Sequence, residues 1–217
     1  MASTYVIGVR ELCEFTAKTG SLDHRFTPSP TAAQGVEGHR LVAQRRPPDY
    51  EVEVPLSGEY GELRIRGRAD GFDPQRGELE EIKTFRGRLE SIPPNMRLLH
   101  WAQACVYGSL LCDSRSLPEL TVTVVYFDVV SQTEHPQTQR FSAQELRQFM
   151  QAQAERFLQW ARAEMHHRAE RDAALKNLVF PLLPFRPGQR ELAAAVFQAC
   201  RDGAVLRAQA PTGIGKT

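Results

Sequence analysis

The chain has 217 residues, of which 41% are hydrophobic and 24% are charged, and its formal net charge is +1. This is the composition of an ordinary globular protein with one full core and room for part of a second. No apolar run approaches the ~20 residues of a membrane span, and the early YVIGV is too short for a signal-peptide core. We therefore expect a cytoplasmic protein, whose net charge neither requires nor excludes a nucleic-acid partner.

The cysteines are scattered along the chain without a C-x-x-C pair: Cys13, Cys105, Cys112 and Cys200. This spacing argues against a zinc ribbon and against the disulfide framework of a secreted protein. We expect buried thiols, because free cysteine is often buried.

The first part of the chain predicts two helices. Apolar residues at helical spacing in VRELCEFTAK predict a short helix that ends at Gly20. Ser29 followed by Pro30 predicts the start of a second helix, which runs to about Arg46.

Residues 50–85 predict a meander of three strands. YEVEVPL and ELRIRGRADGF alternate in strand fashion and are joined by the turn-like SGEYG. DPQRG forms a second turn, which leads into ELEEIKTF.

The next part predicts a helix, two strands and a further helix. PPNMRLLHWAQACVYGSLLC reads as a helix after Pro94, ELTVTVVYFDVV as a buried strand, and QTQRF as an edge strand beside it. Ser142 and Glu145 form a capping box for a long polar helix that reaches past His167. The whole order predicts an α/β fold, a mixed sheet flanked by helices.

The composition changes near residue 178, where LVFPLLPFRPGQ holds three prolines in an apolar setting. ELAAAVFQACRDG then predicts a short helix ending at Gly203, and AVLRAQA predicts a strand that runs into APTGIGKT. We expect two domains, residues 8–177 and residues 178–217.

The strand ELEEIKTF carries an unusual pair of charges. Alternation places Glu81 and Lys83 on one face, either as a surface salt bridge or as half of a metal-dependent active site. A tight hairpin would bring Asp70, at the end of the preceding strand, next to Glu81. Two carboxylates this close repel unless a cation lies between them, and oxygen ligands suit magnesium or manganese.

Such a metal ion would lower the pKa of a bound water and stabilise charge on a phosphoryl group, and Lys83 is placed to orient that water. Together these parts describe phosphodiester hydrolysis. His39, on the preceding helix, could supply an imidazole ligand, which favours a manganese-tolerant site. In the later helix, His100, Gln103 and Tyr107 form one polar stripe.

These residues resemble the RecB-type branch of PD-(D/E)xK nucleases, which includes CRISPR-associated exonucleases and nuclease domains fused to helicases. The resemblance rests on His39, Asp70, the EIK of Glu81 to Lys83, and QACVY as a Q-x-x-x-Y motif, and it covers roughly residues 8–165. Gly67 and Asp70 match the branch's G-x-x-D form, although no proline precedes Asp70.

The resemblance implies a role for each matching position. The metal ligands would be His39, Asp70, Glu81 and the Ile82 carbonyl, and Lys83 would be catalytic. Gln103 and Tyr107 would contact DNA or brace the site. Several relatives hold an iron–sulfur cluster on one cysteine before the core and three closely spaced cysteines after it. Cys13 is present but no such trio follows, so we expect no cluster.

APTGIGKT fits the Walker A form, with Ala210 where the first glycine usually stands. Gly213 and Gly215 would let backbone amides approach phosphates, Lys216 would reach the β- and γ-phosphates, and the Thr217 hydroxyl would bind magnesium.

Upstream, FRPGQ resembles the adenine-reading Q motif of helicases, with Gln189 as the base contact. Residues 185–217 together resemble the XPD/DinG type of ATP-dependent DNA helicase. We expect only the start of a motor domain, because no Walker B acid or arginine finger follows within the 217 residues. ATP is then a cofactor of the complete helicase alone.

The sequence therefore predicts a metal-dependent DNA nuclease placed before a helicase, acting in DNA repair on single-stranded DNA. One alternative is a motor protein whose nuclease-like region only binds and guides DNA. Another is a catalytically inactive binding module. The intact set of Asp70, Glu81 and Lys83 favours the nuclease. Cleavage polarity, exonuclease or endonuclease mode, preference for DNA over RNA, and oligomeric state stay open.

Overall fold

The computed structural model describes residues 5–20, 30–179 and 184–209. The chain divides into two compact units, Met1–Met165 and His166–Thr217. The expected domain boundary at residue 178 stays a prediction.

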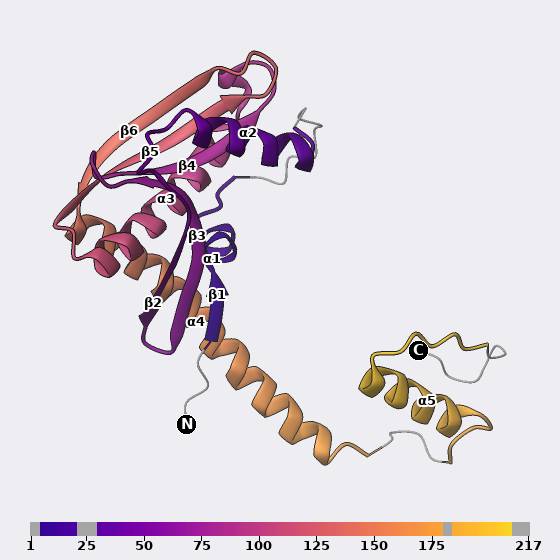
Figure 1. Ribbon diagram of the computed structural model, residues 1–217. Helices are drawn as coiled ribbons and strands as arrows, with labels where there is room; N and C mark the ends of the chain where they lie inside the picture. The colour runs from indigo at the N-terminus through magenta and orange to yellow at the C-terminus, as the bar shows by residue number, and fades with distance from the viewer. Residues whose placement is uncertain (1–4, 21–29, 180–183, 210–217) are drawn as a thin grey trace. The chain divides into compact units, whose positions relative to one another are not determined.

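A six-stranded mixed sheet forms the centre of the first unit (Figure 1). Its strand order is β1-β3-β4-β5-β6, with β2 paired to β3. The pairings β1–β3 and β4–β5 are parallel and the others are antiparallel. The strands are β1 (Tyr5–Gly8), β2 (Glu51–Tyr60), β3 (Leu63–Asp73), β4 (Glu78–Phe85), β5 (Glu119–Asp128) and β6 (Glu134–Ser142). The expected mixed sheet flanked by helices is confirmed.

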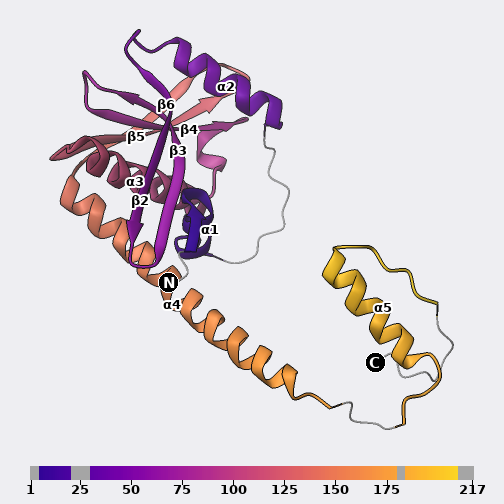
Figure 2. The same cartoon turned by 60° about the horizontal axis from the view of Figure 1, so that its bottom comes forward.

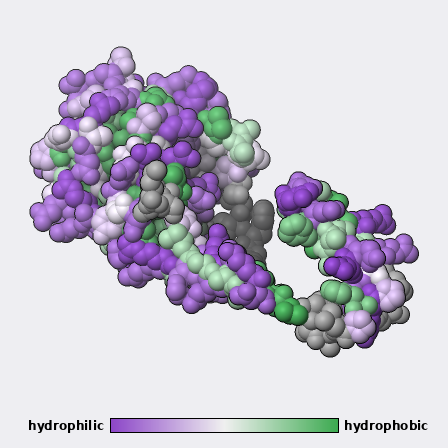
Figure 3. All heavy atoms as spheres, turned by 90° about the horizontal axis from the view of Figure 1, so that it is seen from below, coloured by the Kyte–Doolittle hydropathy of each residue, from purple (hydrophilic) through white to green (hydrophobic). Residues whose placement is uncertain are grey.

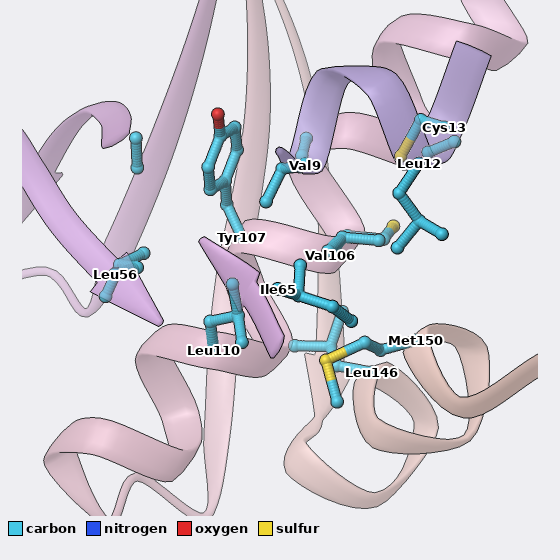
Figure 4. Packing of buried hydrophobic residues seen from close by; sticks show 14 of the residues in the cluster. Val9, Leu12, Cys13, Leu56, Ile65, Val106, Tyr107, Leu110, Leu146 and Met150 are labelled. Carbon is cyan, nitrogen blue, oxygen red and sulfur yellow. The ribbon is translucent and has the colours of Figure 1, made fainter. Parts of the chain in front are cut away.

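Helices cover both faces of this sheet (Figure 2). On one face, α2 packs Val42 against Ile82, Val125 and Phe127 in a small apolar cluster. On the other face, α1, α3 and α4 enclose the larger core, part of which is drawn in Figure 4. The helices of the first unit are α1 (Val9–Thr16), α2 (Ala32–Gln44), α3 (Pro94–Arg115) and α4 (Ala143–Lys176), the last of which continues into the second unit, and a 3-10 turn spans Leu89–Ser91.

The most buried elements are those with the most apolar sequences. β5, rich in valine and aromatic residues, is buried from Val122 to Asp128. α3 is buried continuously from Ala102 to Cys112. It begins at Pro94, a position where the backbone N–H that proline lacks would have no partner within the helix. The capping box of Ser142 and Glu145 forms as predicted, with the Ser142 backbone N–H donating to Glu145 at 2.7 Å.

Several local features differ from the predictions. Tyr5–Gly8 forms a strand that the sequence did not predict, and the first helix ends at Thr16 instead of Gly20. The second helix begins at Ala32, because Thr31 and Gln34 form a reciprocal capping box; Pro30 lies before it, and Ser29 lies outside the described residues. SGEY belongs to β2, and the turn that follows uses Gly61 at φ 55.

The second unit contains α5 (Gln189–Asp202), which ends at Gly203 as predicted. Residues 204–209 do not form the predicted strand. A strand needs a neighbour for its backbone hydrogen bonds, and the described part of this unit contains no other strand. Residues 210–217, with the Walker A motif, lie outside the described residues, so the predicted P-loop helicase fragment is not shown.

Hydrophilic residues predominate on the face drawn in Figure 3. None of the helices in the described ranges is long and apolar enough to cross a membrane.

Candidate active site

A fork in the sheet brings Asp70 to the backbone of the Glu81–Lys83 segment. On one side of β3, β2 pairs along nearly the whole strand. On the other side, β1 pairs with Leu63 to Arg66, and β4 pairs only with Gly71 to Asp73. On this side of β3, residues 67–70 pair with neither β1 nor β4. The β3–β4 ladder ends at Gly71, the residue next to Asp70.

The Asp70 side chain takes over at the point where this ladder stops. Its Oδ2 accepts a hydrogen bond from the backbone N–H of Ile82 at 2.6 Å. This bond occupies a donor that the diverging strands leave without a ladder partner. It holds the Asp70 carboxylate at the start of the EIK segment, as the sequence predicted from a tight hairpin.

His39 reaches the same carboxylate from α2. Its Nδ1 lies 3.4 Å from Asp70 Oδ1. The hydrogen bond to Asp70 raises the pKa of His39, against the effect of burial. The preceding Gly38 permits this approach, since a Cβ there would lie 2.5 Å from the Thr84 side chain and 3.1 Å from Phe127. The glycine lets α2 lie directly on β4 and β5.

Glu81 and Lys83 lie on the opposite face from Ile82, as alternation predicted. Lys83 Nζ donates to Glu81 Oε1 at 2.6 Å and to Gln103 Oε1 at 2.8 Å. Burial raises the pKa of Glu81, although the Lys83 ammonium opposes this. The second carboxylate oxygen, Oε2, is buried and has no hydrogen-bond partner within the described residues. A buried carboxylate oxygen without a donor is costly, so this atom is poised for a ligand.

The predicted polar stripe of α3 meets this site at its middle. Gln103 holds Lys83, as described above, while Tyr107 packs over Gly67, where a Cβ would lie 2.8 Å from its ring and hydroxyl. Burial, with smaller contributions from the carboxylates of Glu81 and Asp70, raises the pKa of Tyr107. Its hydroxyl therefore stays protonated. Figure 4 shows Tyr107 on α3 with Val9 of α1 and Leu56 of β2.

His100, the first residue of the stripe, lies apart from the carboxylates. Its Nδ1 is 3.2 Å from the hydroxyl of Tyr126. Burial and then the Lys83 charge lower the pKa of His100 to about 3, so the imidazole is neutral. It contributes to the packing behind Lys83.

A second charge network, which the sequence did not reveal, lies on the α2 face of β4. Glu80 Oε2 accepts from Arg46 at 2.7 Å and from the Tyr50 hydroxyl at 2.7 Å. Arg46 also bonds Glu134 on β6 at 2.7 Å. Tyr50 reaches Glu80 across Gly71, where a Cβ would lie 1.8 Å from the hydroxyl. The glycine next to Asp70 was the sequence signal for this close approach.

The donor chemistry of this site fits a divalent cation. Asp70, Glu81 and His39 offer two carboxylates and an imidazole, which suit magnesium or manganese, and Glu81 Oε2 lacks a partner. In the described ranges, however, no three His, Cys, Asp or Glu side chains are close enough to hold an ion. The sequence also assigned the Ile82 carbonyl to the metal; the structure places its N–H on Asp70, and the carbonyl's role stays a prediction.

A cavity of about 600 Å³ opens beside this site on the α2 side, lined among others by His39, Asp70 and Ile82. Glu53, another lining residue, stands opposite Asp70 on β2 with a left-handed φ of 54. Such strained backbone is found preferentially at functional sites.

The other predicted site residues lie in the second unit. Gln189 is the first residue of α5, and its side chain accepts from the backbone N–H of Arg186 at 2.8 Å. The Walker A residues lie outside the described residues: Gly213, Gly215, Lys216 and Thr217. The nucleotide contacts stay predictions.

The expected burial of the thiols holds for Cys13, Cys105 and Cys112, whereas Cys200 is exposed. Burial raises the pKa of Cys13 and of Cys105 to about 12. These thiols stay protonated and behave as small apolar side chains.

Comparison with known proteins gives distant likenesses only. No protein-family model and no curated protein matches the chain. Among solved structures, SSO0001 is similar at 18% identity and a TM-score of 0.44, over 71% of this chain and 78% of that one. A phage-related exonuclease from Haemophilus somnus 129PT is similar at 14% identity and a TM-score of 0.40, over 72% of this chain and 82% of that one.

A protein from Eubacterium rectale has the same identity and TM-score, 14% and 0.40, over 79% of this chain. The chain spans 61% of the length of that protein.

Proposed function

We propose that the first unit is a metal-dependent nuclease that hydrolyses phosphodiester bonds in DNA. The observation that carries this proposal is that Asp70 is bonded to the backbone next to Glu81, while Glu81 is bonded to Lys83 on one oxygen and has no partner on the other within the described residues. Structural carboxylates are normally fully hydrogen-bonded, so a buried orphan oxygen is better explained by a ligand than by packing.

Each side chain has a role in this chemistry. His39, Asp70, Glu81 and the Ile82 carbonyl would hold a magnesium or manganese ion, which, when bound, activates a water and stabilises phosphoryl charge. Lys83, held by Glu81 and Gln103, would orient the attacking water or neutralise the charge that develops on the phosphate. Tyr107, on α3, would stabilise the position of β3 at the fork through its contact with Gly67.

A second candidate is a region that binds and guides DNA without cutting it. Two observations favour it: Glu81 is bonded to Lys83, and no three His, Cys, Asp or Glu side chains of the described residues are close enough to hold an ion. In either case, the sequence motifs of the second unit support a proposal that it begins an ATP-dependent DNA helicase, with repair as the natural setting.

Cleavage of labelled single-stranded DNA with manganese and without ATP tests the first candidate against the second. The purified chain should produce shorter fragments, and the same preparation with a chelator should not. If the chain binds DNA but does not cleave it in either magnesium or manganese, the second candidate, a region that only binds and guides DNA, is supported instead of the nuclease.

A further inference from the structure

Three arginines share one face of β3 and lead to Asp70. In Leu63–Asp73, Leu63, Ile65 and Ala69 are buried, whereas the alternate residues Arg64, Arg66 and Arg68 are exposed. Asp70 is the next residue on that face. Residues two apart on a strand are separated by roughly 6.6 Å, so the guanidinium groups form a row that ends at the candidate active site.

The two outer arginines are paired, and the middle one is not. Arg64 bonds Glu59 at 2.8 Å, and Arg68 lies 3.2 Å from Glu53, both as exposed pairs. Arg66 stands opposite Ser57 on β2, which is uncharged. Within the described residues no ion pair involves Arg66, so its charge is available to a ligand. Exposed ion pairs contribute little free energy, so Arg68 can also turn to a stronger anion.

Arg66 and Arg68 also line a cavity. A cavity of about 600 Å³ opens where β1 ends, at Gly8, and is lined by these two arginines with Gly67 between them. Its lining also includes Pro55, Leu56 and Ser57 of β2, so it lies along the part of β3 that precedes Asp70. Gly8 leaves this space open, since a Cβ there would come no closer than 3.9 Å to another residue, whereas the space over Gly67 is occupied by Tyr107.

We propose that this cavity holds a backbone phosphate of the nucleic acid, next to the phosphate that is cleaved, with Arg66 as its principal contact. The inference rests on the proposed function, since it names where the substrate strand would run. An arginine binds a phosphate through two parallel N–H donors, which suits an anion of this shape. A strand held at Arg66 and Arg68 would be led along the row toward Asp70.

Substitution of Glu11 should change the binding affinity in the opposite direction from substitution of Arg66. Glu11 lines the same cavity, and its Oε2 lies near Gly8, so the lining residues include two arginines and one glutamate. A bound phosphate would be repelled by Glu11 and attracted by Arg66. Removing the Glu11 charge should therefore strengthen binding, which general damage to the fold would not do.

The experiment measures the affinity of a fluorescent single-stranded oligonucleotide for the full chain in chelator, where cleavage cannot occur. Arg66→Gln should weaken binding about fivefold to tenfold and reduce the dependence of affinity on salt by roughly one phosphate contact. Arg66→Lys should recover part of the loss, and Glu11→Gln should tighten binding. Arg140→Gln is the matched control, because Arg140 is an exposed, paired arginine on β6.

Oligonucleotides with a 5′-phosphate or a 5′-hydroxyl distinguish two sources of the anion. An Arg66 effect on both indicates an internal phosphodiester, and an effect on the first alone indicates a terminal phosphate. Equal affinities of Arg66→Gln and Arg140→Gln, or no binding by the wild-type chain, would overturn the inference. If binding depends on Arg66 but no cleavage occurs with a metal ion present, the phosphate site is supported and the proposed nuclease activity is contradicted.

Discussion

At the scale of single residues, the candidate site depends on one buried carboxylate and one ammonium group. Glu81 is held by Lys83 on one oxygen and has no partner on the other within the described residues. Lys83 in turn is fixed by Gln103. This arrangement orients the amine before any substrate arrives, which is the condition under which a charge is most effective in catalysis.

We expect Glu81→Gln and Lys83→Ala each to lower the rate of DNA cleavage by at least ~10²-fold, because each removes a group that acts on the reacting phosphate. The fold should persist, since the neighbouring Leu79 and Phe85 keep their places in the core. Cleavage assays with circular dichroism of each variant measure both effects. Near wild-type cleavage by either variant would show that the site is assigned wrongly.

His100 should make the protein less stable in mild acid. Its pKa in the folded protein is about 3, against about 6.5 in an unfolded chain. Between these values the unfolded state binds a proton that the folded state does not, so stability falls as the pH drops from 6.5 toward 3. In His100→Gln this loss should disappear, and the amide can keep the bond to Tyr126.

Urea unfolding at pH 7 and pH 4.5 measures the difference between the variant and the wild type. The variant should gain stability relative to the wild type at the lower pH, whereas the exposed His167→Gln should not. A constant difference between wild type and His100→Gln at the two pH values would mean that the imidazole is protonated in the folded protein.

At the scale of elements, the position of α2 decides whether His39 reaches Asp70. Gly38 lies against Thr84 and Phe127, while Gly35, one turn earlier, has only an ordinary contact of 3.7 Å to Thr84. The charge network of Glu80, Arg46 and Tyr50 fixes the chain that leaves this helix. Close packing at a glycine and a buried ion pair together hold the helix against the sheet.

Gly38→Ala should destabilise the protein by about 1–3 kcal/mol and weaken manganese binding, because the added methyl group pushes α2 away from β4. Gly35→Ala is the control on the same helix, and it should be neutral or stabilising by up to ~1 kcal/mol through helix propensity. Thermal melts with and without manganese compare the two. Equal behaviour of both variants would show that α2 does not lie closely against β4.

Local sequence patterns predicted the elements but not the contacts made by distant residues. The bounds of β4 and its two faces followed from alternation between two turns, and a short hairpin placed Asp70 near this strand, where it bonds the Ile82 N–H. The strand β1 was missed because its partner lies 58 positions away, at Tyr5 against Leu63. The bonds of Arg46 to Glu80 and Glu134 span 34 and 88 positions, which no local pattern encodes.

At the scale of the whole first unit, the candidate ligands come from three elements that meet only in the folded state. His39 is on α2, Asp70 on β3 and Glu81 on β4. An unfolded chain does not hold these side chains together, so an ion that binds them favours the folded state by mass action. Metal binding and stability are therefore coupled, and stability can report on the site without any cleavage assay.

We expect manganese at about 100 times its dissociation constant to raise the free energy of unfolding of the first unit by about 2.7 kcal/mol. Asp70→Asn should remove most of this gain, because it takes away a charged ligand while the amide oxygen can still accept the bond from Ile82. Asp113→Asn is the matched control, since Asp113 is an exposed carboxylate paired with Arg147 at the end of α3. Thermal melts of the full chain with manganese and with a chelator give the shift for each protein. A manganese shift in Asp70→Asn as large as in Asp113→Asn would place the ion elsewhere, and with it the chemistry that we assign to the fork of the sheet.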